Sequence, residues 1–497
     1  MKTTTQSDRI IFGLKVRQLR QGKQLSFADL SKLANVSVSY LNEIEKGKKY
    51  PKEDKITALS KALEVPYEQL ISSELDSSLA PVTELLQSNF LNELPLDLFG
   101  IEVAKVVEII ANAPSRVGAF ISTLLEISRN YALKEEHFYF GALRSYLELH
   151  DNYFQELEDA VEQFKKQYDL APGKPVPGSI LKQILESDFG YTITEDGLSQ
   201  YEDLQDMRSV FLQHKKQLLL NGGLSESQKT FQYGKEIAFN YLKLKERAGT
   251  SSLLKPKTFE EVLNHSKGIY FSVALRVPLD DFVKEIGLLF KSPVWDAGAF
   301  LGLITKYEAS PEIIYHRLTN VLPKYFGIKK LYFLRFTYGQ AEAKYKIDRE
   351  LHLSYRHPPH SNGLSEHYCR RWVAVSLLKE FEEKQKEEGV TNAITRAQRS
   401  HYVDSDEEYL NLTIARSGHP GQGQNVSVTI GMLVDKNLEE QILFLNDPSI
   451  QTKNVNRTCE RCIMQDCKER VAEPMVIIKR QKLHKIQEVI RHLDEIQ

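Results

Sequence analysis

Ser26-Phe-Ala-Asp-Leu-Ser-Lys-Leu-Ala34 is the first of two segments that define the fold at the start of this 497-residue chain. The second follows after two residues and is Ser37-Val-Ser-Tyr-Leu-Asn-Glu-Ile-Glu-Lys46. Each segment begins with a serine, which is a favoured residue at the N-cap, the position just before the first turn of a helix. Apolar residues follow at helical spacing. The pattern predicts two short helices joined by a tight turn, set among five short helices over residues 9–72. We therefore expect an all-α helix-turn-helix domain.

In a helix-turn-helix motif, the start of the second helix points into the major groove of DNA. Small or polar side chains are expected there, whereas Leu41 and Ile44 fall on the opposite face, toward the core. The side chains predicted to face DNA are Ser26, Ser37, Val38, Ser39, Asn42 and Glu43. The flanking side chains predicted to neutralise phosphates are Arg17, Arg20, Lys46 and Lys48.

The charge distribution agrees with a separate basic head. Residues 1–72 contain 13 Lys and Arg against 8 Asp and Glu, a net charge of +5, although the whole chain carries −2. The remainder is therefore acidic, and only the head is expected to bind a polyanion. The start of the chain lacks the apolar run of a signal peptide, and no segment has the length of a membrane span, so a cytoplasmic protein is expected.

The head resembles the Cro and phage-repressor (XRE) family, which has a lambda-repressor-like fold. The resemblance rests on Leu14-Lys-Val-Arg-Gln-Leu-Arg20, Ala28-Asp-Leu-Ser-Lys-Leu-Ala34 and Tyr40-Leu-Asn-Glu-Ile-Glu-Lys-Gly47. It implies binding to double-stranded operator DNA. Phe27 stands where that family usually has a glutamine that touches phosphate and base.

Beyond the head, the sequence predicts a multidomain protein that is mostly α with an α+β carboxyl-terminal half. Helical periodicity over 85–170 predicts a helical bundle, after a linker at 73–81, and the Pro- and Gly-rich segment 171–178 predicts a second linker. Strand-like runs occupy 331–336, 351–355, 410–415 and 426–434, and His357-Pro-Pro-His360 indicates a loop. After Pro474 a single helix is predicted, which we expect to pack onto its own domain more readily than to form a coiled coil.

Residues 171–300 resemble the ImmA/IrrE metallopeptidases in the stretch from Gln217 to Phe239. In that family an edge strand containing asparagine precedes a helix that carries His-Glu-x-x-His. Here the corresponding residues are Lys235, Glu236, Ile237, Ala238 and Phe239. Neither lysine nor phenylalanine replaces a zinc-binding imidazole. We therefore expect a degenerate domain with no catalytic residues, rather than an enzyme. A zinc site rebuilt on His214 or His265 is the less favoured alternative.

Three of the four cysteines of the chain lie in a C-x₂-C-x₄-C segment, Cys459, Cys462 and Cys467. Three thiolates need a fourth ligand, and the remaining cysteine is Cys369. Four cysteinates suit either a Cys₄ zinc site or a cubane iron–sulfur cluster. Isolated buried cysteines are the alternative.

The combination of an XRE head, a degenerate ImmA-like segment, a Cys-x-x-Trp segment at Cys369 and the terminal cysteines resembles the short-chain fatty-acid (ScfR-type) transcriptional regulators. The resemblance implies that residues 301–497 form a mixed α+β sensor domain. It further implies a [4Fe–4S] cluster on Cys369, Cys459, Cys462 and Cys467 and an acyl-CoA effector. Arg370 and Arg371 depart from the family's pattern at this position; they could serve a CoA phosphate, adjust a cluster's potential, or be ordinary solvated charges.

The function expected from the sequence is a homodimeric, DNA-binding transcriptional regulator of short-chain fatty-acid or central carbon metabolism. A dimer is expected because one helix-turn-helix covers too little DNA for strong specificity. The alternatives are a metalloprotease that acts on a repressor, and an antitoxin-like repressor that responds to no small ligand.

Overall fold

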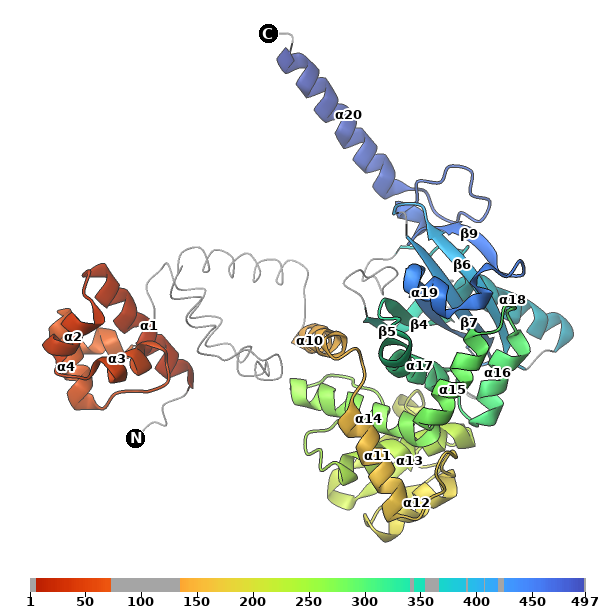
Figure 1. Cartoon of the computed structure of the whole chain (residues 1–497), viewed down its shortest axis with the longest axis horizontal. Helices are drawn as coiled ribbons and strands as arrows, with labels where there is room; N and C mark the ends of the chain where they lie inside the picture. Colours follow the sequence, from red (N-terminus) through yellow and green to blue (C-terminus); the bar gives the residue numbers. More distant parts are fainter. Residues whose placement is uncertain are drawn as a thin grey trace. The chain divides into compact units, whose positions relative to one another are not determined.

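The computed structural model describes residues 6–72, 135–339, 344–353, 366–389, 392–405, 407–418 and 424–495 (Figure 1). The chain divides into two compact units, one comprising Met1–Ala142 with Lys257–Phe259 and the other Leu143–Pro256 with Glu260–Gln497. The predicted linker at 73–81, the bundle segment 85–134 and the loop at 357–360 lie outside the described residues.

The five predicted helices of the head are present. They are α1 (Gln6–Gly22), α2 (Phe27–Ala34), α3 (Val38–Glu45), α4 (Glu53–Leu63) and α5 (Tyr67–Ile71). The Ser26 hydroxyl accepts the Asp29 amide at the start of α2, and the Asp29 side chain accepts the Ser26 amide in return. Asn35 ends α2 in the left-handed conformation, which turns the chain sharply into α3.

One apolar cluster holds these helices together. Its buried members include Val16 from α1, Leu30 from α2, Leu41 and Ile44 from α3 and Leu59 from α4. Leu41 and Ile44 therefore lie on the core face of α3, as the sequence predicts, and this leaves the opposite face of α3 toward solvent.

The second unit begins with helices. Beyond α10 (Glu135–Leu149), these are α11 (Gln155–Gln167), α12 (Gly178–Ser187), α13 (Glu226–Tyr241), α14 (Phe259–Arg276), α15 (Leu279–Phe290), α16 (Ala297–Lys306) and α17 (Pro311–Phe326). The predicted linker 171–178 forms the connection between α11 and α12. A small sheet of β1 (Thr192–Thr194), β2 (Ser209–Leu212) and β3 (Gln217–Leu220) has the order β1-β3-β2. The strand before Asn221 is therefore the central strand of its sheet, and the expectation of an edge strand is wrong.

A six-stranded sheet dominates the carboxyl-terminal half, with the order β5-β4-β8-β7-β6-β9. All four predicted strands belong to it, as β4 (Leu331–Gly339), β5 (Lys344–Leu353), β7 (Glu408–Arg416) and β8 (Val426–Leu433). Two further strands, β6 (Ile394–Tyr402) and β9 (Gln451–Val455), lacked a clear alternating pattern in the sequence. The pairing is antiparallel except between β6 and β9.

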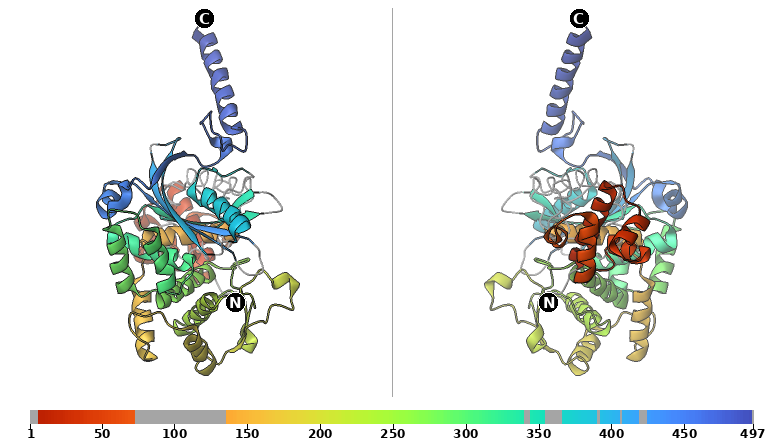
Figure 2. Two further views of the ribbon diagram at one scale, coloured as in Figure 1. Left: turned by 90° about the vertical axis from the view of Figure 1, so that its right-hand side faces the viewer. Right: turned by 90° about the vertical axis from the view of Figure 1, so that its left-hand side faces the viewer.

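Helices cover both faces of this sheet (Figures 1 and 2). On one face, α18 (Val373–Glu388) packs Val375 and Leu378 against Leu334 and Phe336 of β4. On the other face, the Tyr315 ring of α17 contacts the alternate residue of β4, Phe333. Consequently β7 and β8 are buried along almost their whole length.

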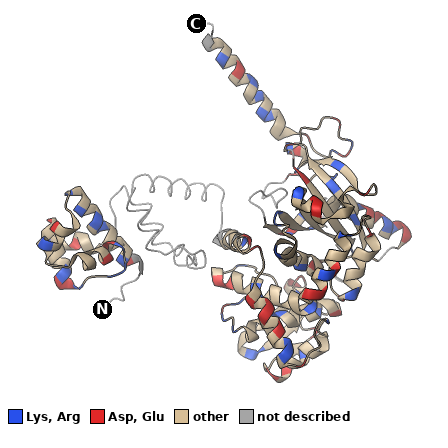
Figure 3. Cartoon of the chain, viewed as in Figure 1, with Lys and Arg blue, Asp and Glu red and all other residues tan. Residues whose placement is uncertain are grey.

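The last helix, α20 (Met475–Glu495), extends away from the sheet of its own unit (Figures 1 and 2). Its apolar side chains Leu483, Ile486, Ile490 and Leu493 are all exposed, by 48 to 61%. The expectation that this helix packs onto its own domain is therefore wrong. Lysine and arginine predominate among the charged residues along it (Figure 3). None of the helices in the described part of the chain combines the length and apolar composition needed to cross a bilayer.

Candidate nucleic-acid interface and candidate metal centre

The start of α3 forms the exposed surface expected of a recognition helix. Ser37, Val38 and Ser39 are exposed, Val38 by 47%, and Asn42 and Glu43 are half-buried on the same face. The hydroxyl of Ser37 accepts the amide of Tyr40 and so begins the helix. A small side chain that also caps the helix leaves room for a base edge to approach Ser39 and Asn42.

Ser26 has a structural role that the sequence only partly indicated. Its hydroxyl accepts the Asp29 amide and donates to the Asp29 carboxylate at 2.6 Å. This bond lowers the pKa of Asp29, as does the Ser26 amide. Both groups lie at the exposed start of α2, where the partial positive charge of the helix favours an anion.

Arg20 lies inside the domain, although the sequence pattern placed it among the phosphate contacts. Its side chain is 9% exposed, and its Nε and Nη2 donate to the two carboxylate oxygens of Glu45 at 2.6 and 2.9 Å. Its Nη1 donates to the Leu25 carbonyl, and the guanidinium lies 4.1 Å from the centre of the Phe27 ring. Each of its three nitrogens thus donates a hydrogen bond within the domain, so Arg20 joins α1 to α3 rather than contacting DNA.

The other predicted phosphate contacts lie nearer the surface. Lys48 is exposed, and Lys46 and Arg17 are half-buried. Sequence reasoning missed Lys49, whose ammonium lies 2.8 Å from the Glu43 carboxylate. The ion pair and the hydrogen bond to Glu43 raise the pKa of Lys49. Its position three residues beyond the end of the predicted helix was the available signal.

The segment that resembles a metallopeptidase helix lies on α13, and its buried groups are already paired. Glu236 receives two hydrogen bonds from Arg247, at 2.7 and 2.6 Å, and one from the Tyr191 hydroxyl at 3.0 Å. The Arg247 guanidinium also lies 4.1 Å from the centre of the Phe239 ring. An arginine, which the sequence did not single out, therefore holds the carboxylate that a metallopeptidase would use as its base.

Lys235, at the position of the first expected zinc ligand, is 3% exposed. Its pKa is lowered to about 8, chiefly by burial and also by the nearby charges of Arg247, Arg349 and Arg208, against the opposing effect of Glu236. His265 is also buried, and His214 is exposed on a short 3₁₀ turn, Gln213–Lys215. In the described part of the chain, no three His, Cys, Asp or Glu side chains are grouped to hold a metal ion, so no zinc site is rebuilt there.

The four cysteines converge on one pocket, which they line together with Arg370, Arg371 and Arg470. Backbone hydrogen bonds join their two segments, from the Cys369 amide to the Arg457 carbonyl and from the Cys459 amide to the His367 carbonyl. Cys459, Cys462 and Cys369 are buried. Burial raises the pKa of the Cys369 thiol to about 11 and also raises that of Cys462.

Charged side chains hold the loop that carries three of these cysteines. Arg470 donates to the carbonyls of Cys459 and Cys462, and Arg461 forms an ion pair with Glu366 at 2.8 Å. Glu460 accepts the amide of His367. These contacts fix the loop against the segment before Cys369, which is the arrangement that a metal site needs around its ligands.

The donor set therefore suits a thiolate-bound metal in chemistry and in position around one pocket. The sulfurs are not, however, grouped at metal-ligand spacing among the described residues. The two arginines beside Cys369 have other partners: Arg370 lies 4.4 Å from the centre of the Tyr345 ring, and Arg371 donates to the Asn454 carbonyl.

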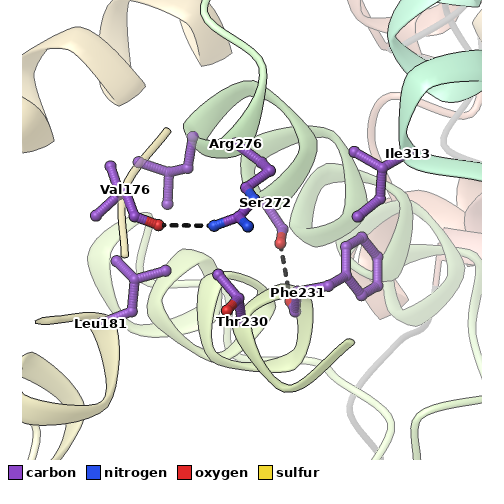
Figure 4. A pocket seen from close by; sticks show the side chains of 8 residues that line it. Val176, Leu181, Thr230, Phe231, Ser272, Arg276 and Ile313 are labelled. Atoms are coloured by element: carbon purple, nitrogen blue, oxygen red, sulfur yellow. Dashed lines mark hydrogen bonds between the residues drawn. The ribbon is translucent and has the colours of Figure 1, made fainter. Parts of the chain in front are cut away.

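A second pocket, between α12, α13, α14 and α17, has no free polar group (Figure 4). Arg276 donates to the carbonyls of Val176 and Glu308, and the Ser272 hydroxyl donates to the Phe231 carbonyl. The other lining residues include Leu181 and Ile313. With its polar groups already bonded, this pocket belongs to the packing between helices.

Comparison with known proteins identifies the head. The helix-turn-helix family HTH_3 matches residues 16–70, which include all of α2, α3 and α4, so this segment is a helix-turn-helix domain. No curated protein matches the chain. A solved structure described as a Mycobacterium tuberculosis transcriptional regulator is similar with 18% identity and a TM-score of 0.45, over 66% of this chain and 92% of that chain.

Proposed function

We propose that the protein is a sequence-specific, DNA-binding transcriptional regulator. The observation that carries the proposal is the helix-turn-helix domain at 16–70, in which the start of α3 is exposed while Leu41 and Ile44 anchor its other face. A helix held in this way presents three or four side chains to the edges of bases. The net charge of +5 over residues 1–72 supplies attraction to phosphates.

Two matched substitutions test the interface. Asn42→Asp and Gln69→Glu each replace an amide by a carboxylate of the same shape, the first on α3 and the second on α5. After an operator has been selected from random DNA with the full chain, Asn42→Asp should weaken binding by about 10- to 100-fold, from the loss of one base contact. Gln69→Glu should change it little. Equal effects of the two substitutions would contradict a recognition role for α3.

We further propose that the carboxyl-terminal half holds a metal centre on Cys369, Cys459, Cys462 and Cys467 and senses a metabolite or the redox state. Their common pocket and the loop contacts of Arg470 support this proposal. An iron–sulfur cluster bound there would supply a redox-sensitive group, whereas zinc would supply only structure. Brown protein with iron and sulfide, purified without oxygen, would indicate the cluster, and Cys467→Ser should bleach it. Protein with neither iron nor zinc would contradict the centre.

The effector proposed from the resemblance is an acyl-CoA. Its test is operator binding with and without propionyl-CoA, at equal ionic strength. A change in operator affinity supports the sensor, whereas operator binding that responds neither to acyl-CoA nor to oxidation favours an antitoxin-like repressor.

We propose that α13 has no hydrolytic role. The contacts of Glu236 with Arg247 and the chemistry of Lys235 and Phe239 support this, because a metalloprotease needs zinc bound at these positions. Zinc that persists in a Cys369→Ser, Cys467→Ser double variant, together with peptide hydrolysis that is lost in Glu236→Gln, would revive the protease alternative.

The proposed homodimer has a candidate contact on α20. Leu483, Ile486, Ile490 and Leu493 recur at intervals of 3, 4 and 3 and are exposed, so a second copy of the helix could bury them. Sedimentation of the full chain should give a dimer, and Leu483→Lys with Ile490→Lys should give a monomer. As a control, Gln481→Lys adds charge on the opposite face of the helix. A dimer that survives the double substitution would place the contact elsewhere.

A further inference from the structure

Four arginines gather in the second unit with too few carboxylates to neutralise them. Arg208 lies just before β2, Arg335 on β4, Arg349 on β5 and Arg416 at the end of β7. We call these four residues, together with Glu312 of α17, the arginine cluster. They come from segments far apart in the sequence.

Two of the arginines have acidic partners. The Nε of Arg335 donates to both carboxylate oxygens of Asp348, and its Nη1 lies 3.6 Å from Oε1 of Glu312. The Nη2 of Arg416 donates to the same Glu312 oxygen at 2.6 Å. Burial disfavours the charged form of Glu312, but the charges of Arg416, Arg335 and Arg208 outweigh it and keep its pKa well below the usual range.

The other two arginines lack such partners. Neither the Arg208 nor the Arg349 guanidinium makes an ion pair or a hydrogen bond with any residue in the described ranges. Arg349 is the direct cross-strand partner of Arg335, which places two like charges opposite each other. Burial lowers the pKa of Arg208 to about 10, and Arg349, Arg335 and Arg416 contribute by repulsion. The pKa of Arg349 falls for the same reasons, burial first and then Arg335.

The excess positive charge extends to Lys235 of α13. The charges of Arg349 and Arg208 both act on the Lys235 ammonium. Arg247, which also lies near, is neutralised by Glu236. Among the described residues, four arginines and one lysine thus face two carboxylates, Glu312 and Asp348, which leaves an excess of about three positive charges there. A buried charge without a partner lowers the stability of the folded protein, and such groups are concentrated at binding and catalytic sites.

The side chains of the cluster reach solvent in part. The side chains of Arg335, Arg416 and Glu312 are 14, 18 and 12% exposed, and Arg208 and Arg349 are half-buried. Guanidinium groups bind planar and tetrahedral oxyanions through paired N–H donors. We infer that the arginine cluster binds a small molecule that carries at least two negative charges on its oxygens, as a phosphate ester or a polycarboxylate does, through the free guanidinium groups of Arg208 and Arg349.

Binding of this anion requires no contact with DNA, so the inference goes beyond the regulatory function proposed above. If operator binding also responds to the anion, the cluster is the effector site. If the anion binds without that response, only the link to regulation fails.

The test uses the full chain with three probes at constant ionic strength: pyrophosphate, citrate and, as a monovalent control, acetate. Calorimetric titration should detect pyrophosphate or citrate and not acetate; pyrophosphate alone would indicate a phosphate ester, and citrate alone a polycarboxylate. Arg349→Gln and Arg208→Gln should each weaken the binding by at least about tenfold, the loss of one charge-assisted contact.

Arg396→Gln is the matched control. Arg396 lies on β6 of the same sheet, and its guanidinium donates to Glu380, outside the cluster. It should leave binding unchanged. Absence of binding by both pyrophosphate and citrate would overturn the inference. So would binding that persists in both Arg349→Gln and Arg208→Gln, because the anion would then lie elsewhere, for example on the basic head.

Discussion

Two arginines, one buried and one half-buried, differ in whether the protein provides a partner for the guanidinium. Arg20, in the helix-turn-helix domain, donates a hydrogen bond from each of its three nitrogens, two of them to the carboxylate of Glu45. Arg349, in the second unit, faces another arginine across the strand pair and has no carboxylate within bonding distance among the described residues. Both positions cost desolvation, but only the first recovers it within the protein.

A buried charged side chain can therefore have one of two roles: it can hold two elements of the fold together, or it can bind a ligand. A paired buried charge fixes the position of two elements, here α1 and α3, and its loss exposes the partner. An unpaired one contributes nothing to the folded state and is retained at the expense of stability. The two kinds of site should therefore respond to mutation with opposite signs.

The largest effect should come from Glu45→Ala. It leaves the Arg20 guanidinium buried without its partner, and a broken buried pair costs about 3–5 kcal/mol. Hydrogen exchange of the α1 and α3 amides in the full chain should accelerate accordingly, and operator binding should fall with it.

The double variant Arg20→Met, Glu45→Leu checks the cause. Because it removes both charges and keeps the volume, it should restore most of the protection of α1 and α3. If it is as unstable as Glu45→Ala, the pair matters for its shape rather than for its charge.

Lys235→Met should stabilise the second unit. A folded-state pKa of about 8 against the ordinary value of 10.5 means that folding disfavours the protonated lysine below pH 8. At about 1.4 kcal/mol per pKa unit, the cost at pH 7 is about 3 kcal/mol, and it disappears as the pH rises from 8 to above 10.5. The two tryptophans of the chain, Trp295 and Trp372, both lie in the second unit, so their fluorescence in urea reports its unfolding.

The pH dependence is the decisive part of this experiment. The difference in free energy of unfolding between Lys235→Met and the wild type should be constant below pH 8 and shrink above it. A difference that does not change up to pH 10.5 would mean that the substitution acts through packing alone.

Glu312→Gln should act in the opposite direction to Lys235→Met. It removes the negative charge that holds Arg416 and Arg335, and a hydrogen bond to a charged group contributes about 1.5–3 kcal/mol. Because the folded-state pKa of Glu312 is lowered, its contribution is present above the ordinary pKa of a glutamate and is lost progressively as the pH falls from there toward the much lower folded-state pKa. Tryptophan fluorescence in urea at pH 7 and pH 3 should show the full destabilisation at the first pH and a smaller one at the second.

The helix-turn-helix could be predicted because its signals are local. Serine caps, apolar spacing and the turn lie within about twenty residues, and Ser26, Ser37, Leu41 and Ile44 occupy the expected places. The burial of Arg20 was not predictable in the same way, since its partner Glu45 is 25 residues away on another helix. The four strands with continuous apolar runs were also predicted. Strand β6 was not, because its polar residues Arg396, Gln398 and Arg399, which have partners in the folded protein, interrupt the apolar pattern of a strand.

The second unit shows the limit of sequence reasoning more clearly. The four cysteines were a candidate site because they are few in so long a chain, and the fold brings Cys369 to the same pocket as the other three. The arginine cluster gave no such signal, because arginine is common and its members lie just before β2 and on β4, β5 and β7. Only the sheet register, which places Arg335 opposite Arg349, makes the excess charge visible.

The smallest expected effect on stability comes from the experiment that compares the two arginines most directly, because the same substitution is made at both. Arg20→Gln should destabilise the head, seen as faster hydrogen exchange in α1 and α3. Arg349→Gln, without added anion, should stabilise the second unit by about 0.2–1 kcal/mol, since it removes a like charge directly across a strand pair. Tryptophan fluorescence in urea measures the free energy of unfolding of the second unit.

In saturating pyrophosphate or citrate the wild type should instead be more stable than Arg349→Gln, because the wild type then gains binding energy that the variant lacks. Destabilisation by Arg349→Gln without anion, equal to that in its presence, would show instead that this arginine belongs to the fold, as Arg20 does.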